Sequence, residues 1–246
     1  MINTLLITGC THGLGRALAL RFAHLGCFVY AVGRNESLLR ELATISALLH
    51  PVVADIATAA GRKEISNQVD MQKPLSIIHN AAIAKPAQFA SLTGALLREH
   101  FETNYFAPIL ITHHFLSSLI NQQRILHISS GAANMALPGL MPYCATKAAL
   151  EHTTQCLNAE LNQRGVYCAN LSPGMIDTPM QTSLRNSSQD VLPDREFYVR
   201  AKIENKLIAP EVAAKFVSWV MLKTENEAFS QTRWNIYDVP REQWNI

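Results

Sequence analysis

Short apolar runs alternate with segments of helical apolar spacing along the whole chain, and this alternation constrains the fold most strongly. The runs are continuously apolar, which is typical of parallel strands that helices bury on both faces. We predict an α/β fold with seven strands, at residues 2–8, 27–32, 51–54, 75–79, 124–129, 166–171 and 232–237. Helices are predicted near residues 14–22, 38–42, 56–71, 92–119 (one helix or two), 142–162 and 210–222.

A glycine-rich turn joins the first predicted strand to the first predicted helix, with the sequence Thr8-Gly9-Cys10-Thr11-His12-Gly13-Leu14-Gly15. Glycines at such a place allow a tight turn and a close approach of the backbone to a pyrophosphate, which rests on the helix N-terminus. A purely structural turn is the alternative. Because the turn follows a strand and opens a helix, it favours a Rossmann-type, doubly wound parallel sheet that binds a dinucleotide.

The end of the second predicted strand indicates which dinucleotide. An NAD-binding chain normally carries a carboxylate there for the ribose hydroxyls, whereas an arginine accommodates the 2′-phosphate of NADP. Here Gly33 and Arg34 follow the strand, with no carboxylate. We therefore predict NADP(H) as the cofactor, with His12 either beside the same phosphate or exposed on the turn.

Composition and length favour one domain, residues 1–246, since no composition break or repeat divides the chain. Hydrophobic residues make up 48%, charged residues 16%, and the net charge is +2, so neither disorder nor a nucleic-acid or anionic-membrane partner is implied. No apolar run approaches the roughly 18 residues that cross a bilayer, and no basic leader precedes the first apolar run. With five cysteines and no C-x-x-C pair, we expect reduced thiols and a cytoplasmic protein.

One long stretch, residues 175–208, has no regular apolar period, and its portion 183–190 is polar. Irregular segments of this length in a compact domain are usually functional. We predict a substrate-binding loop or lid here, with a disordered surface excursion as the alternative.

Tyr143 and Lys147 stand four residues apart at the start of a predicted helix, and Ser130 follows the fifth predicted strand. Residues at i and i+4 share one helix face, so the ammonium group can lie near the phenol and lower its pKa for proton transfer. Ser130, at the carboxyl end of a strand, could hydrogen-bond a carbonyl oxygen. The Y-x-x-x-K spacing alone is common by chance.

Together the motifs closely resemble those of the short-chain dehydrogenase/reductase family, in its single-domain branch of chains about this length. The family's motifs are T-G-x-x-x-G-x-G, N-A-G, Y-x-x-x-K and P-G, and this chain has them in the same order over nearly its whole length, with N-A-A at residues 80–82 in place of N-A-G. The resemblance implies an oxidoreductase that transfers hydride between NADP(H) and a carbonyl/alcohol pair. It implies four catalytic residues: Asn104, Ser130, Tyr143 and Lys147.

In these implied roles, Tyr143 is the proton donor or acceptor, Ser130 holds the substrate oxygen, and Asn104 holds a water in a proton relay. Lys147 lowers the pKa of Tyr143 and binds the nicotinamide ribose. The remaining implied contacts are with the cofactor, and Asn80 also stabilises the central sheet. The full cofactor set is Thr8, Gly9, Thr11, His12, Gly13, Leu14, Gly15, Arg34, Asp55, Ile56, Asn80, Ala81, Tyr143, Lys147, Pro173, Gly174, Ile176 and Thr178.

Two departures from the family pattern concern Ala82, in place of the last glycine of N-A-G, and the C-terminus, which lacks the usual Gly-Gly. The second leaves a homodimer and a homotetramer both open. A non-catalytic NADP(H)-binding sensor is the alternative function, although it would not need all four catalytic residues. An epimerase or dehydratase of the family's longer branch fits the glycine spacing poorly. His113 and His114 have no partner at ligand spacing, so no metal is predicted.

The substrate is not specified by a motif. Large apolar residues stand between Ser130 and Tyr143 and in the predicted lid, so small apolar or aromatic ketones or diketones fit better than phosphorylated sugars. The residues expected in this wall are Met135, Leu137, Leu140, Met141, Met175, Met180, Phe197 and Tyr198.

Overall fold

The computed structural model describes residues 2–119 and 122–244 of the protein. Within that part of the chain, seven parallel strands form one sheet in the order β3-β2-β1-β4-β5-β6-β7. The strands are β1 (Thr4–Thr8), β2 (Phe28–Gly33), β3 (Leu49–Val53), β4 (Ser76–His79), β5 (Gln123–Ile128), β6 (Val166–Ser172) and β7 (Trp234–Asn235). The predicted doubly wound fold is confirmed. The chain reverses its direction of strand addition between β1 and β4, where such sheets bind ligands.

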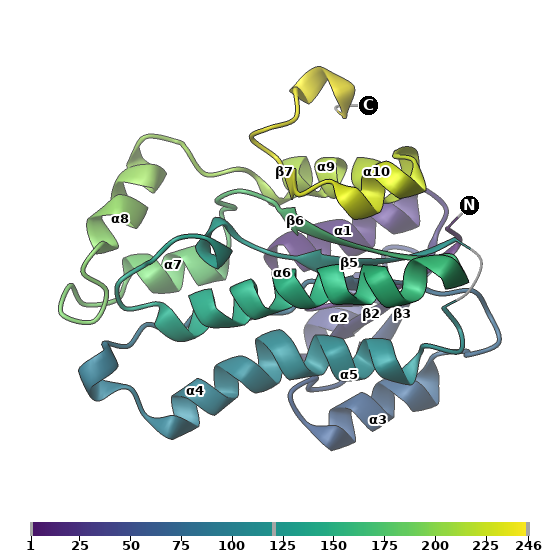
Figure 1. Cartoon of the computed structure of the whole chain (residues 1–246), viewed down its shortest axis with the longest axis horizontal. Coiled ribbons are helices and arrows are strands. Elements are labelled where there is room, and N and C mark those ends of the chain that lie inside the picture. The colour runs from purple at the N-terminus through teal and green to yellow at the C-terminus, as the bar shows by residue number, and fades with distance from the viewer. Residues whose placement is uncertain (1, 120–121, 245–246) are drawn as a thin grey trace.

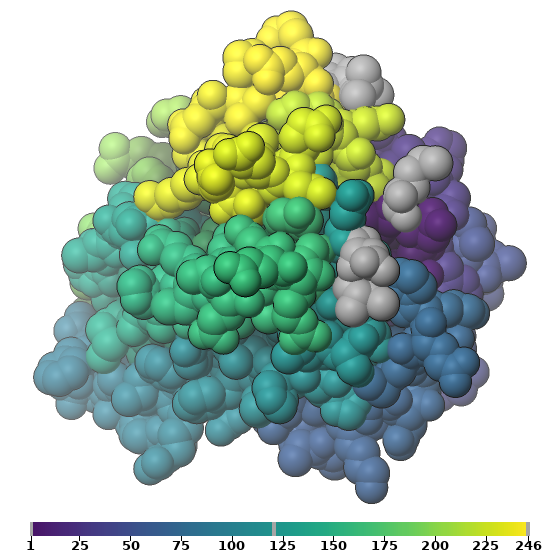
Figure 2. All heavy atoms as spheres, turned by 45° about the vertical axis from the view of Figure 1, so that its right-hand side comes forward, coloured from purple at the N-terminus to yellow at the C-terminus, as the bar shows by residue number. Residues whose placement is uncertain are grey.

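Helices cover both faces of the sheet (Figure 1). One face carries α1 (Gly13–His24), α2 (Glu36–Ala43), α9 (Pro210–Lys223) and α10 (Asn226–Gln231). The other carries α3 (Ala59–Gln68), α4 (Gly94–Phe101), α5 (Ala107–His114) and α6 (Met141–Leu161). In Figure 2, α6 occupies the middle of the second face, between the C-terminal segment and the helices that precede it.

The strands are continuously apolar because successive side chains enter opposite cores. Leu5 and Ile7 of β1 belong to the core under α1 and α9, and Leu6 between them belongs to the core under α3 and α5. In a strand, neighbouring side chains point to opposite faces, so a sheet buried on both sides needs an apolar residue at every position.

The structure differs from the sequence predictions at several element boundaries. The region predicted as helix 92–119 is α4, a π-helical turn (Glu102–Phe106) and α5, which ends at His114. The last strand covers Trp234–Asn235, although the backbone N–H of Ile236 still donates to Ser172. Short 3-10 turns, which were not predicted, lie at Phe89–Ser91, Gly131–Ala133, Asn162–Arg164 and Arg241–Gln243.

The segment 175–208 is not irregular, contrary to the prediction. It contains α7 (Pro179–Arg185) and α8 (Arg195–Ile203). Its two ends are joined, since Ile208 N–H donates to Met175 and Asp177 N–H donates back to Ile208. Three of its apolar side chains, Leu184, Leu192 and Tyr198, form a small core together with Ala84 and Leu140, which lie outside the segment.

Candidate active site

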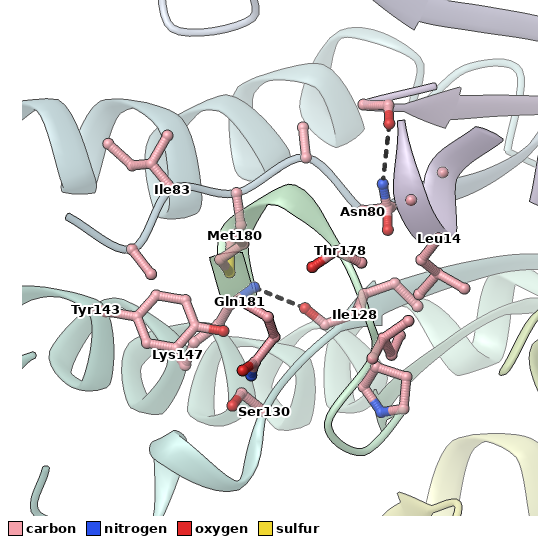
Figure 3. A pocket seen from close by; sticks show the side chains of 18 of the residues that line it. Leu14, Asn80, Ile83, Ile128, Ser130, Tyr143, Lys147, Thr178, Met180 and Gln181 are labelled. Carbon is pink, nitrogen blue, oxygen red and sulfur yellow. Dashed lines mark hydrogen bonds between the residues drawn. The ribbon is translucent and has the colours of Figure 1, made fainter. Parts of the chain in front are cut away.

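A cavity of about 690 Å³ opens at the carboxyl ends of the strands, between the glycine-rich turn and α7 (Figure 3). Most of the predicted site residues line this one cavity, although they come from distant parts of the chain. They are Gly9, Thr11, His12, Gly13, Leu14, Gly15, Arg34, Asp55, Ile56, Asn80, Ala81, Ser130, Tyr143, Lys147, Pro173, Gly174, Ile176 and Thr178. Two predicted residues, Thr8 and Asn104, are buried behind the wall.

The glycine-rich turn has the conformation that its sequence requires. Gly9 and Gly13 have φ values of +78° and +52°, in the region that favours glycine. A Cβ on Gly15 would lie 2.0 Å from the carbonyl oxygen of Gly9, so the turn can close onto α1 only without a side chain there. The first turn of α1 contains no acidic residue, and no side chain caps it. The turn therefore presents backbone N–H groups, which suit a pyrophosphate.

Thr8 and Asn80 join the ends of β1 and β4 beneath this turn. The hydroxyl of Thr8 accepts from the backbone N–H groups of Asn80 and Ala81, at 3.0 and 3.1 Å. The Asn80 side chain donates to the Thr8 carbonyl oxygen at 2.9 Å. Thr8 thus positions the cavity floor without lining it, and the bonds support the sheet-stabilising role expected of Asn80.

Asn104 lies in the π-helical turn between α4 and α5, and its carboxamide is fully engaged by the protein. Its oxygen accepts from the backbone N–H of Ile83 at 2.8 Å, and its nitrogen donates to the Ile83 carbonyl oxygen and the Thr146 hydroxyl. These bonds fix the segment after β4 against α6. The side chain therefore positions that segment, and the water-holding role of Asn104 stays a prediction.

Ser130, Tyr143 and Lys147 meet on the cavity wall, as the sequence spacing predicted (Figure 3). Ser130 caps a 3-10 turn, in which its hydroxyl accepts from Ala132 N–H at 3.2 Å, and it also hydrogen-bonds Tyr143. Lys147 lies under the tyrosine, with Nζ 5.8 Å from the ring centroid, and donates to the Ile128 carbonyl oxygen at 2.7 Å. β5 and α6 together therefore hold all three groups.

The net shift in the pKa of Tyr143 is upward, opposite to the predicted lowering, and the effect of Lys147 on the phenol stays a prediction. Burial raises the pKa of Tyr143, and the hydrogen bond with Ser130 opposes that rise only in part. The lysine ammonium is directed at the Ile128 carbonyl oxygen. Burial also lowers the pKa of Lys147 to about 8, against the opposing effect of Glu151. Desolvation, which the spacing of residues cannot reveal, dominates both groups.

The substrate side of the cavity is mostly apolar, in agreement with the predicted wall, except that Met141 lies outside it and is exposed. Several lining residues were not predicted: Ile83, Ala84, Gln181, Leu184, Asn235 and Tyr237. Asn235 and Tyr237 lie at the end of the last strand, where the strand-end rule could have found them. Gln181 had no such signal, because α7 was not predicted.

Comparisons with known proteins identify the family. The profile of the short chain dehydrogenase family matches residues 3–189. The chain belongs to the short-chain dehydrogenase/reductase family. It is 28% identical over 242 residues to a benzil reductase ((S)-benzoin forming) of Bacillus cereus, with 92% of this chain and 95% of that protein covered. It is 30% identical over 184 residues to an L-xylulose reductase of Caenorhabditis elegans, with 72% of each covered.

Solved structures agree with the fold. The short chain dehydrogenase/reductase YIR035C of Saccharomyces cerevisiae superposes with a TM-score of 0.89 at 23% identity, over 97% of both chains. The KRED1-Pglu enzyme superposes with a TM-score of 0.85 at 25% identity, over 94% of this chain and 99% of that one. This member of the family is therefore an oxidoreductase that uses a nicotinamide cofactor.

Across residues 2–119 and 122–244, no cluster of His, Cys, Asp or Glu side chains could hold a metal ion. In the same part of the chain, no helix has the length and apolar character of a membrane span. His113 and His114 are exposed at the end of α5.

Proposed function

We propose that this protein is an NADP(H)-dependent carbonyl reductase that acts on small apolar or aromatic ketones. The observation that carries the proposal is the meeting of Ser130, Tyr143 and Lys147 in one cavity with the glycine-rich turn. The benzil reductase relative acts, by its name, on an aromatic diketone, which agrees with the apolar wall of this cavity.

The residues present fit a dinucleotide. A Cβ on Gly13 would lie 2.7 Å from Thr178, so the glycine-rich turn is in contact with the segment after β6, and both line the cavity of about 690 Å³. The turn would hold the pyrophosphate, Asp55 and Ile56 would flank the adenine, and Arg34 would meet the 2′-phosphate. When bound, the nicotinamide supplies the hydride.

The chain's own residues would manage the proton and the substrate oxygen. The raised pKa keeps the phenol of Tyr143 protonated at neutral pH, and this form donates a proton to a carbonyl oxygen that is being reduced. The Ser130 hydroxyl, hydrogen-bonded to the phenol, would orient the same oxygen. Lys147 would be the nearby cation that stabilises the phenolate left after transfer.

Tyr143→Phe tests the proposal, since it removes the acidic proton and little volume. We expect kcat with NADPH and an aromatic ketone to fall by about 10²- to 10⁴-fold, the usual contribution of general acid catalysis, with Kd for NADPH unchanged. Tyr105→Phe is the matched control, because the Tyr105 hydroxyl bonds Thr153 and does not line the cavity.

Retention of more than about a tenth of the wild-type kcat would contradict the role of Tyr143. Failure of the wild type to oxidise NADPH with any carbonyl compound would instead favour the alternative, a non-catalytic sensor. A homodimer or homotetramer and a cytoplasmic location stay predictions.

A further inference from the structure

Gln181 carries a polar group that the catalytic assignment leaves unexplained. It lies in the first turn of α7 and lines the cavity, and its Oε1 atom is shielded from solvent. No donor among residues 2–119 and 122–244 reaches that oxygen. Buried polar atoms in proteins nearly always have partners, so a shielded, unpaired acceptor in a ligand cavity indicates that a ligand group completes it.

The packing of α7 fixes the direction of this side chain. Leu184, three residues later and on the same helix face, is buried in the small core with Leu140 and Tyr198. Thr182 and Ser183, on the other side of the helix, are exposed. The helix cannot rotate Gln181 out of the cavity without also removing Leu184 from its core.

The carboxamide is directed at the part of the cavity where the reaction would take place. In Figure 3 the Gln181 side chain points into the space that the hydroxyls of Ser130 and Tyr143 also face. Those two hydroxyls would take the oxygen of the reacting carbonyl. Gln181 therefore stands where it can meet a second polar group of the same small substrate.

We infer that Gln181 is a specificity-determining residue that binds an oxygen on the carbon next to the reacting carbonyl. The unpaired Oε1 atom accepts, so it suits the hydroxyl of an α-hydroxy ketone, whereas the second carbonyl of an α-diketone has no hydrogen to donate to it. A simple ketone would leave it unpaired. Because the cavity wall is apolar, we expect the substituents on these two carbon atoms to be alkyl or aryl groups. This inference rests on the proposed carbonyl reductase function.

Three ketones with one skeleton test the inference in NADPH oxidation assays: benzil, benzoin and deoxybenzoin, which has a methylene in place of the second oxygen function. Gln181→Leu should lower kcat/KM for benzoin by about tenfold, and leave kcat/KM for benzil and deoxybenzoin within about twofold. Gln181→Met should do the same, and thermal unfolding shows whether each variant is folded. Ser183→Ala, an exposed change on the same helix, should leave all three values unchanged.

An equal loss on all three ketones, or no loss, would overturn the inference. So would a weaker Kd for NADPH that accounts for the effect, because Gln181 would then serve the cofactor. In each of these cases, turnover of deoxybenzoin that depends on Tyr143 leaves the proposed function intact. Absence of turnover of all three ketones by the wild type would refute both.

Discussion

Replacement of Arg34 by alanine should remove most of the preference for NADPH over NADH. Arg34 follows β2, is exposed, and lines the cavity. Glu36, the nearest carboxylate in sequence, is held by Arg40 through hydrogen bonds of 2.6 and 2.8 Å. The position where NAD-binding chains place a carboxylate is Gly33, and a Cβ there would lie 2.7 Å from the Thr11 side-chain methyl, so a carboxylate side chain at this position would require Thr11 to shift.

The expected magnitude follows from the exposure of Arg34. Charge-assisted hydrogen bonds contribute about 1.5–3 kcal/mol, and water and salt weaken those at the surface. The lower end, about 1.5 kcal/mol, is therefore the appropriate figure for this site, and it corresponds to about a tenfold preference for NADPH. His12, exposed on the glycine-rich turn, should contribute less than Arg34.

The assay is kcat/KM for NADPH and for NADH at fixed ketone concentration, in the wild type, Arg34→Ala and a charge-matched control. Arg98→Ala is that control, because Arg98 is exposed on α4 and does not line the cavity. The ratio should fall toward one in Arg34→Ala alone. A wild-type ratio near one, or a ratio that Arg34→Ala does not change, would refute the assignment of Arg34 to the 2′-phosphate.

Two further predictions concern the lid and a buried histidine pair. Trypsin should cut residues 175–208 more slowly when NADPH and a ketone analogue are bound, because residues of this segment form part of the cavity wall. Equal cleavage rates would argue against a lid. His79 and His127 stack on neighbouring strands, and burial, together with Lys147, lowers the pKa of His127 from 6.5 to about 3. Burial, then His127, lowers the pKa of His79 well below 6.5. Below pH 6.5 the unfolded chain binds protons that the folded chain does not, so the free energy of unfolding should fall by up to about 1.4 kcal/mol per pH unit per histidine as the pH drops toward 3. Urea unfolding at pH 7 and pH 5 measures this, with His113→Gln as an exposed control, and equal stability at the two pH values would contradict it.

Much of the fold could be predicted from the sequence because it depends on local patterns. Continuous apolar runs predicted a sheet buried on both faces, and the glycines of the first turn predicted a tight turn, which has a positive φ at Gly9 and no room for a side chain at Gly15. Helices α7 and α8 were missed because they are short and polar. Helices of this length are marginal by themselves, and tertiary contacts such as those of Leu184 and Tyr198 stabilise them.

The sequence by itself determined the order of the elements, the dinucleotide turn and the spacing of Tyr143 and Lys147. Only the tertiary structure decided what those groups meet. It buried the phenol and the ammonium, so that desolvation raises one pKa and lowers the other. It places the Asn104 side chain in hydrogen bonds with Ile83 and Thr146, and it places Gln181 in the cavity wall. Burial and hydrogen-bond partners come from segments far apart in the chain, and no local pattern carries that information.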